Sequence, residues 1–257
     1  VSALGSALAT TPYLFAFFRF LGGLGVGAST IAAPAYISEI APAKDRGRLV
    51  GLYQFNIVFG ILVAFLSNYF LSNLGENAWR YMMGVEAIPA IIYTLLTLGI
   101  PKSPRWLFLQ NRAVEAKAII FQAYAKEDAD SLIADISKEQ DVAVENESIF
   151  KPKYRFILKL AFLIAFFNQF SGINAFLYYA PRIFEEGGLG ESTALLSSVG
   201  IGLINLIFTL IGINLIDRLG RKSLMYIGSV GYIISLSLIA ASFLLSWEGL
   251  ALPIFLF

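Results

Sequence analysis

Long windows without charged residues constrain this chain more than any other feature. Five windows of about 20 residues or more contain no Asp, Glu, Lys or Arg: 20–38, 49–75, 160–181, 192–216 and 223–247. A sixth window, 81–101, contains only Glu86. A helix needs about 20 mostly apolar residues to cross the hydrocarbon core of a bilayer. The sequence therefore predicts an all-α membrane protein with six complete spans and two partial ones, at 1–11 and 250–257.

Composition excludes several classes of function. Hydrophobic residues make up 57% of the chain and charged residues 14%, whereas soluble domains carry about 25% charged residues. A net charge of +1 gives no basic excess to hold nucleic acid. The 257 residues contain no Cys and no His, which removes thiol nucleophiles, Cys/His zinc sites and Ser-His-Asp arrangements. We therefore expect that the chain is not an enzyme and that it binds no metal, no cofactor and no nucleic acid.

Basic residues predict the orientation of the spans. Sixteen Lys and Arg fall in the connections on one side, whereas only Arg80 and Arg182 fall on the other. Because Lys and Arg accumulate in cytoplasmic loops, the first side is predicted to be cytoplasmic. It includes the only long polar stretch, about 103–153, in which 111–124 is the clearest amphipathic helix. Two interpretations stay open for this stretch: a solvated linker and a brace for a gate.

A cluster of uncharged amides lies deep within one window. Gln169 follows Lys159 by ten residues, which puts it about 15 Å into the bilayer at 1.5 Å per helical residue. Asn168, Gln169 and Asn174 flank Gly172, and a glycine with polar neighbours at this depth is typical of a broken helix that lines a cavity. Amides both donate and accept hydrogen bonds, which suits neutral ligands rich in hydroxyl groups.

Other windows supply further candidates. Gln54 and Asn205 are uncharged amides within spans, and Tyr178 adds an aromatic ring that can cover an apolar face of such a ligand. The alternative role for all of these amides is to tie neighbouring helices together. Helix packing is also the role that we predict for Gly23 and Gly27, which form a small-xxx-small face.

Two charges lie inside spanning segments. Arg19 is seven residues after Pro12, and Glu86 is seven residues after Trp79, so both lie roughly 10 Å in from the outer side. Ionisable groups at such depths are costly and indicate function by default. Two interpretations stay open: a structural ion pair that pins two helices, and a functional role.

Five motifs occur in order along the chain. They are RFLGGLGVG at 19–27, EIAPAKDRGR at 39–48, PKSPRWL at 101–107, NQFSGINAFLYYAP at 168–181 and DRLGRK at 217–222. In these motifs the chain resembles the sugar porter family of the major facilitator superfamily over essentially its whole length. The resemblance implies a helical bundle truncated at both ends, with spans 1, 2, 11 and 12 absent.

The resemblance also implies a division of the chain into three parts. Residues 1–100 would hold the end of span 3 and spans 4–6 of the N-terminal bundle. Residues 101–153 would form a cytoplasmic linker with short amphipathic helices. Residues 154–257 would hold spans 7–9 and the start of span 10 of the C-terminal bundle.

Site residues follow from the same resemblance. Positions that contact or gate sugar in the family correspond to Gln54, Gln169, Asn174, Tyr178 and Asn205. Asn168 stands where the family usually has Gln, and it stays among the candidate substrate-binding residues. A cytoplasmic gate of ion pairs would be formed by Glu39, Arg46, Arg105, Asp217, Arg218 and Arg221. Lys102 stands where the family usually has Glu, so it would repel Arg105 rather than pair with it.

The expected function is secondary transport. We predict a multi-pass protein of the cell membrane, monomeric when full length, that moves a monosaccharide or a related polyol by alternating access. Symport with H⁺ and facilitated movement both stay open. The resemblance matches Arg19 to an arginine that pairs with an acid on span 1 in proton-coupled members, so Arg19 and Glu86 are candidates for coupling. The alternative is a sugar sensor with the same fold.

Overall fold

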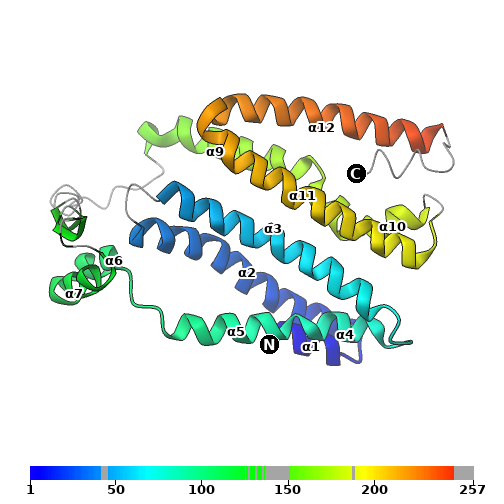
Figure 1. The fold of residues 1–257 in the computed structure, drawn as a ribbon, viewed down its shortest axis with the longest axis horizontal. Helices are drawn as coiled ribbons and strands as arrows, with labels where there is room; N and C mark the ends of the chain where they lie inside the picture. The colour runs from blue at the N-terminus through cyan, green and yellow to red at the C-terminus, as the bar shows by residue number, and fades with distance from the viewer. Residues whose placement is uncertain are drawn as a thin grey trace. The chain divides into compact units, whose positions relative to one another are not determined.

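The structure is a computed structural model that describes residues 1–41, 46–124, 126, 128–130, 132–134, 136, 151–186 and 189–245. All regular secondary structure in these residues is helical (Figure 1). Six stretches are long and apolar enough to cross a membrane: Pro12–Ile40, Gly47–Leu71, Ala78–Leu98, Pro152–Glu186, Glu191–Ile216 and Lys222–Ser242. The predicted all-α fold with six complete spans is therefore confirmed. The predicted partial span at 250–257 lies outside the described residues.

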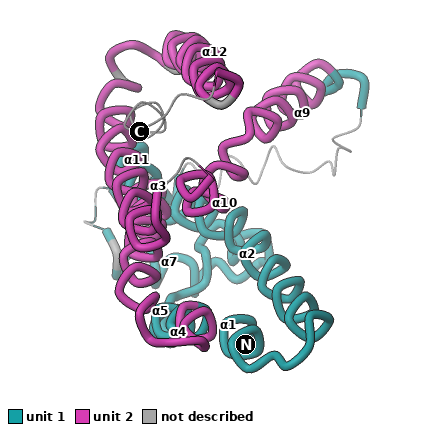
Figure 2. Tube along the Cα trace, turned by 90° about the vertical axis from the view of Figure 1, so that its right-hand side faces the viewer, with its two compact units in different colours: residues 1–53, 83–155 teal, residues 54–82, 156–257 magenta. Residues whose placement is uncertain are grey.

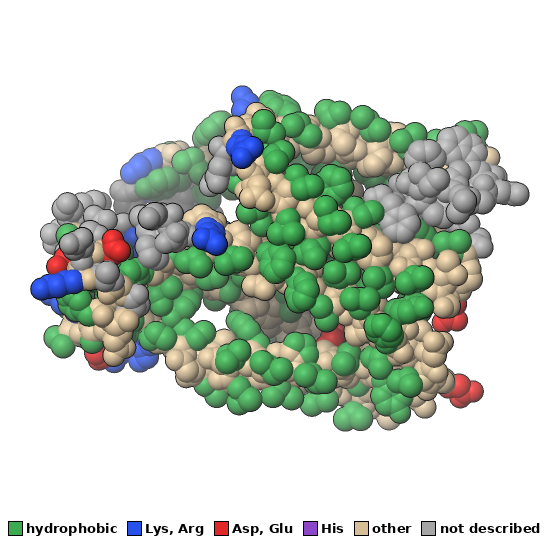
Figure 3. Space-filling view, viewed as in Figure 1, with side chains coloured by type: hydrophobic (Ala, Val, Ile, Leu, Met, Phe, Trp, Pro, Cys, Tyr) green, Lys and Arg blue, Asp and Glu red, His purple; other side chains and the backbone are tan. Residues whose placement is uncertain are grey.

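The chain divides into two compact units (Figure 2). Unit 1 comprises residues 1–53 and 83–155, and unit 2 comprises residues 54–82 and 156–257. Hydrophobic side chains cover much of the length of the helices, and Lys and Arg side chains lie over the segment of unit 1 that carries α6 and α7 (Figure 3). Such an apolar outer surface is what helices surrounded by lipid present.

Unit 1 is built around one long helix. This helix, α2 (Pro12–Ile40), begins where the Thr11 hydroxyl accepts a hydrogen bond from the Leu14 amide at 3.3 Å, with Pro12 in the first turn. The other helices of unit 1 in the spanning region are α1 (Ser2–Leu8), the first residues of α3 (Arg46–Leu71), the last residues of α4 (Ala78–Val85), and α5 (Ala87–Leu98). α2 starts eight residues before the charge-free window, so Arg19 lies inside the helix.

Close packing in unit 1 joins α1 to α2. A Cβ atom at Gly5 would lie 2.3 Å from the Phe18 ring, and one at Gly22 would lie 2.4 Å from a serine oxygen of α1. A Cβ at Gly23 or Gly27 would meet nothing within 4 Å in the described residues. Within the described residues, the close contact belongs to Gly22, which points about 100° away around the helix from Gly23. The packing face at Gly23 and Gly27 stays a prediction.

The polar stretch of unit 1 has a core of its own. α6 (Pro104–Leu109) begins where the Ser103 hydroxyl accepts a hydrogen bond from the Trp106 amide, and α7 (Ala113–Ala123) corresponds to the predicted amphipathic helix. Their apolar faces meet further residues of the same stretch in a buried cluster of Leu107, Phe108, Ala116, Ile120, Ala129 and Ile136. The described part of this stretch is therefore a packed helical element rather than a fully solvated linker.

Unit 2 contains the remaining helices. They are the larger part of α3, the first residues of α4, nearly all of α9 (Arg155–Phe170), α10 (Ile173–Glu186), α11 (Glu191–Leu219) and α12 (Arg221–Leu244). The short 3-10 helix η1 (Pro152–Tyr154) belongs to unit 1. α11 ends at Leu219 and is followed by the C-cap residue Gly220, whose φ of 75° lies in the region that favours glycine. A cavity of about 710 Å³ lies between α9 and α12.

Candidate functional site

The predicted spanning helix at 160–181 is broken near its middle. α9 ends at Phe170, α10 begins at Ile173, and Gly172 between them has a φ of 82°. The Gly172 amide donates to the Gln169 carbonyl at 3.2 Å, and the Gly172 carbonyl accepts from the Phe176 amide at 3.1 Å. Glycine adopts this conformation without steric cost, so the chain can turn here and begin a new helix at once.

The break brings together two of the predicted site residues. The Asn174 Nδ2 atom donates to the Gln169 Oε1 atom at 2.8 Å, and both side chains are exposed. This bond uses one donor of Asn174 and one acceptor of Gln169. In the described part of the chain, the Gln169 amino group and the Asn174 carbonyl oxygen remain available to donate to and accept from a ligand.

The other predicted substrate residues lie on three helices. Tyr178, one turn after Asn174 on α10, has an exposed fraction of 78%. Asn205 is half-buried on α11, and Gln54 is exposed on α3. Among the described residues, no hydrogen bond joins these three side chains to the pair at the break.

Asn168 faces a different part of unit 2. It lines the cavity between α9 and α12 together with Ser171, Ser229 and Tyr232, and the rest of the lining is largely apolar. Gln169 and Asn174 do not line this cavity. The residue that departs from the family pattern is therefore separated from the amide pair, although it is next to Gln169 in sequence.

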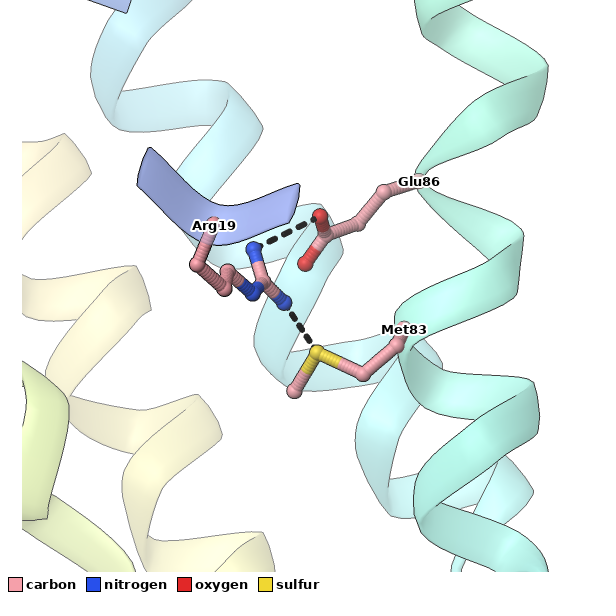
Figure 4. Close-up of polar contacts among 3 residues, drawn as sticks. All are labelled: Arg19, Met83 and Glu86. Carbon is pink, nitrogen blue, oxygen red and sulfur yellow. Dashed lines mark hydrogen bonds and ion pairs between the residues drawn. The ribbon is translucent and has the colours of Figure 1, made fainter. Parts of the chain in front are cut away.

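Arg19 and Glu86 form an ion pair in unit 1. The Arg19 Nη1 atom lies 3.3 Å from the Glu86 Oε2 atom, with exposed side-chain fractions of 36% and 49%. The second guanidinium nitrogen of Arg19 points at the Met83 sulfur, so the guanidinium bridges both side chains (Figure 4). The Phe15 ring lies 5.7 Å from the guanidinium carbon. Glu86 sits at the junction between α4 and α5.

Two contacts of unit 1 were not predicted from the sequence. Met83 precedes Glu86 by three residues, a spacing that shares a helix face, but a methionine in an apolar window gives no sign of a polar contact. The Tyr36 hydroxyl donates to the Pro101 carbonyl at 2.9 Å and links the C-terminal part of α2 to the start of the PKSPRWL motif. This contact joins residues 65 positions apart, so no local pattern indicates it.

The predicted cytoplasmic gate is only partly visible. Glu39 is half-buried near the end of α2, Arg105 is half-buried on α6, and Arg218 is exposed near the end of α11. For the other three predicted gate residues, Arg46, Asp217 and Arg221, the structure describes the backbone but not the side chains. The Lys102 ammonium lies 5.7 Å from the centre of the Trp106 ring, a cation–π contact that gives this lysine a partner other than a carboxylate.

Comparison with known proteins identifies the class. Six apolar helices, a broken span with paired amides and an ion pair within the spans define a multi-pass membrane protein with polar groups in its spanning helices. Residues 1–256 match the family model described as "Sugar (and other) transporter". The chain belongs to this family, the sugar porters of the major facilitator superfamily, whose members are transporters rather than enzymes.

The chain is also similar to individual transport proteins and to a solved transporter structure. The chain is 39% identical over 242 residues to the putative metabolite transport protein YwtG of Bacillus subtilis, covering 93% of this chain and 52% of that protein. It is 34% identical to the D-xylose-proton symporter of Escherichia coli K12, covering 92% and 49%. A partially occluded inward-open structure of the E. coli xylose transporter XylE matches with a TM-score of 0.87 and 31% identity, covering 100% of this chain and 62% of that one. The chain thus spans about half the length of these curated relatives.

Proposed function

We propose that the full-length protein is a secondary transporter that moves a monosaccharide or related polyol across the cell membrane by alternating access. The observation that carries this proposal is the amide pair at the broken span. A spanning helix interrupted by Gly172, with Gln169 and Asn174 bonded across the break, presents neutral donors and acceptors well inside the membrane. Such groups match hydroxyl-rich, uncharged substrates, and broken spans line substrate sites in transporters.

The remaining site residues complete the proposed site. Tyr178 lies one turn beyond Asn174 and offers a ring with an exposed fraction of 78% to the apolar face of a sugar. We assign further hydrogen bonds to Gln54, Asn168 and Asn205. Asn168 reaches the site only if a substrate extends towards the cavity between α9 and α12, because it lines that cavity.

Movement of the substrate requires two bundles that rock against each other. The proposed bundles comprise residues 1–100 and 154–257, with 101–153 as the cytoplasmic connection. The proposed gate of Glu39, Arg46, Arg105, Asp217, Arg218 and Arg221 closes the inner side when the outer side is open. The surroundings of the bundles are lipid, and the proposed functional unit is one full-length chain.

Proton coupling is the finer part of the proposal. The ion pair of Arg19 with Glu86 places a carboxylate and a guanidinium together within the spans, where a proton that neutralises the carboxylate changes the balance of charge strongly. Two relatives are named as proton symporters, for D-xylose and for arabinose. We propose that H⁺ is a co-substrate and that Arg19 and Glu86 take part in the coupling.

The experiment is counterflow with the full-length protein in proteoliposomes. Vesicles loaded with unlabelled sugar should accumulate labelled sugar from outside, because an exchanging carrier equilibrates label against the large internal pool. Candidate monosaccharides are tested one at a time, with vesicles lacking the protein as the control. Binding of a sugar without counterflow would overturn transport in favour of a sensor.

A second assay tests proton coupling by comparing net uptake with and without a protonophore. Equal uptake in the two conditions would overturn the coupling alone.

A further inference from the structure

One helix crossing in unit 2 has almost no space between its partners. A Cβ atom at Gly202 on α11 would lie 3.1 Å from Phe65 Cδ2, 3.2 Å from the Leu62 Cα atom and 3.3 Å from Leu62 Cδ1. One of these three atoms is backbone and cannot rotate away. Gly202 is therefore a point at which α11 closely approaches the main chain of α3, whereas a Cβ at Gly60 on α3 or at Gly212 on α11 would meet nothing within 4 Å.

The crossing lies near the middle of both spans. The apolar span of α3 is Gly47–Leu71 and that of α11 is Glu191–Ile216, so Leu62 and Gly202 lie within about 5 Å of the two span centres at 1.5 Å per residue. The same face of α11 carries small, buried side chains. Ala194 and Ser198 precede Gly202 at intervals of four residues and have exposed fractions of 0%. On α3, Val58 lies one turn before Leu62 and is also buried.

Rocking motion has different consequences at different depths. A rotation of about 15°, of the kind known for rigid-body switches, moves atoms that are 15 Å from the axis by about 4 Å. Atoms on the axis do not move. A contact as tight as that of Gly202 with Leu62 tolerates displacements of only a few tenths of an ångström before atoms overlap or separate, because packed helices have no spare volume. The two helices can therefore tilt against each other only if the axis passes close to this contact.

We propose that Gly202 is the pivot residue on which α11 and α3 tilt during transport, with the Leu62 main chain as its partner surface. This inference rests on the proposed function, in which α3 and α11 belong to opposite bundles. Gly202 also precedes Asn205, a proposed substrate-binding residue, by three residues on α11. The pivot would thus hold one wall of the sugar site at constant depth while the two ends of the helices open in turn.

The first experiment adds one methyl group at the pivot. Gly202→Ala in the full-length protein should lower the maximal rate of counterflow at least threefold while sugar affinity stays within twofold, because the extra carbon obstructs tilting but touches no substrate. Gly212→Ala is the matched control, since it lies on the same helix and its Cβ would meet nothing within 4 Å. It should leave the rate unchanged.

Rescue separates a pivot from a merely structural glycine. Two of the three atoms against Gly202 belong to the side chains of Leu62 and Phe65, so adding Leu62→Ala and Phe65→Ala to Gly202→Ala should recover part of the lost rate. Full recovery is not expected because the Leu62 Cα atom remains. An unchanged rate in Gly202→Ala, or equal losses of rate and affinity in Gly202→Ala without any rescue, would overturn the proposal.

A second experiment leaves Gly202 in place and does not depend on transport. Spin labels are attached to one cysteine pair at the outer ends of α3 and α11 (Asn73 and Ser192) and to another pair at the inner ends (Val50 and Leu219). The 257 residues contain no native cysteine. A pivot predicts two distances for each pair, with the outer distance long when the inner one is short. Distances that change in the same direction, or that do not change, would overturn it. If the distances alternate but no sugar shows counterflow, the pivot stands and the proposed function is wrong.

Discussion

At the scale of single residues, the Arg19 and Glu86 pair shows how a charge is accommodated inside an apolar segment. An isolated charge at the centre of a spanning helix costs about 2.5 to 3.5 kcal/mol on insertion scales. Here the guanidinium has the Glu86 carboxylate at 3.3 Å and the Met83 sulfur beside it. Either a structural or a coupling role is compatible with this geometry, because both need the charges to be paired in one state.

The two roles predict different results for Glu86→Gln. If Glu86 takes part in proton linkage, the variant should flatten or shift the pH dependence of net uptake while sugar counterflow is largely retained, because counterflow needs no net proton movement. Glu185→Gln is a matched control, since Glu185 pairs with Arg182 at 3.7 Å in a solvated helix end and should leave the pH profile as it is. If Glu86→Gln reduces counterflow as strongly as uptake, the ion pair is structural.

The amide pair gives a second prediction at this scale. Gln169→Ala or Asn174→Ala should weaken sugar binding by about 1 to 2 kcal/mol, as expected for one lost neutral hydrogen bond together with a partner left unpaired. Affinity should therefore fall several-fold in an equilibrium binding measurement on the full-length protein. Asn214→Ala serves as the comparison, because the Asn214 amide donates to the Leu210 carbonyl of its own helix. Normal affinity in a folded Gln169→Ala protein would leave Gln169 with a packing role only.

At the scale of elements, the charge-free windows predicted where the spanning helices lie in the sequence, but they did not predict which faces of these helices contact one another. The six spans follow from the cost of ionised groups in lipid, which acts on every residue separately. The break at Gly172 was also predicted, because a glycine between amides is a local signal. The packing of Gly22 against α1 and the bond from Tyr36 to Pro101 depend on which helix faces meet, and single-chain periodicity does not fix that. The separation of Asn168 from Gln169 is a similar case, since neighbours on a helix point about 100° apart.

The helix break gives a prediction at the element scale. Gly172→Ala should lower the free energy of unfolding by about 1 to 2 kcal/mol, because an L-residue with a side chain pays this cost for a left-handed conformation. Gly231→Ala is the matched control: Gly231 is helical within α12, and its Cβ would meet nothing within 4 Å. It should be neutral or slightly stabilising. Unfolding of the detergent-solubilised protein by a graded denaturing detergent measures both, and equal stability of the two variants would contradict the role assigned to Gly172.

At the scale of the whole molecule, the distribution of basic residues sets the orientation. Sixteen Lys and Arg on one side against two on the other predict that the segment with α6 and α7 is cytoplasmic. Cysteines introduced at Ser72 and at Glu191 should then react with a membrane-impermeant thiol reagent applied to intact cells, whereas one introduced at Asp130 should react only after the membrane is opened. Labelling at Asp130 in sealed cells would reverse the assigned orientation.

The buried cluster of α6, α7 and the residues that follow has a consequence for how the protein is made. All of its members, from Leu107 to Ile136, come from 30 consecutive residues, so the cluster can close without help from any spanning helix. Contacts this local form quickly, and synthesis adds only about 5 to 20 residues per second. The segment can therefore be folded before the spans of α9 to α12 leave the ribosome. A compact, folded helical segment cannot pass through a translocation channel as an extended chain. Biosynthesis itself would therefore fix the side of the membrane on which this segment stays.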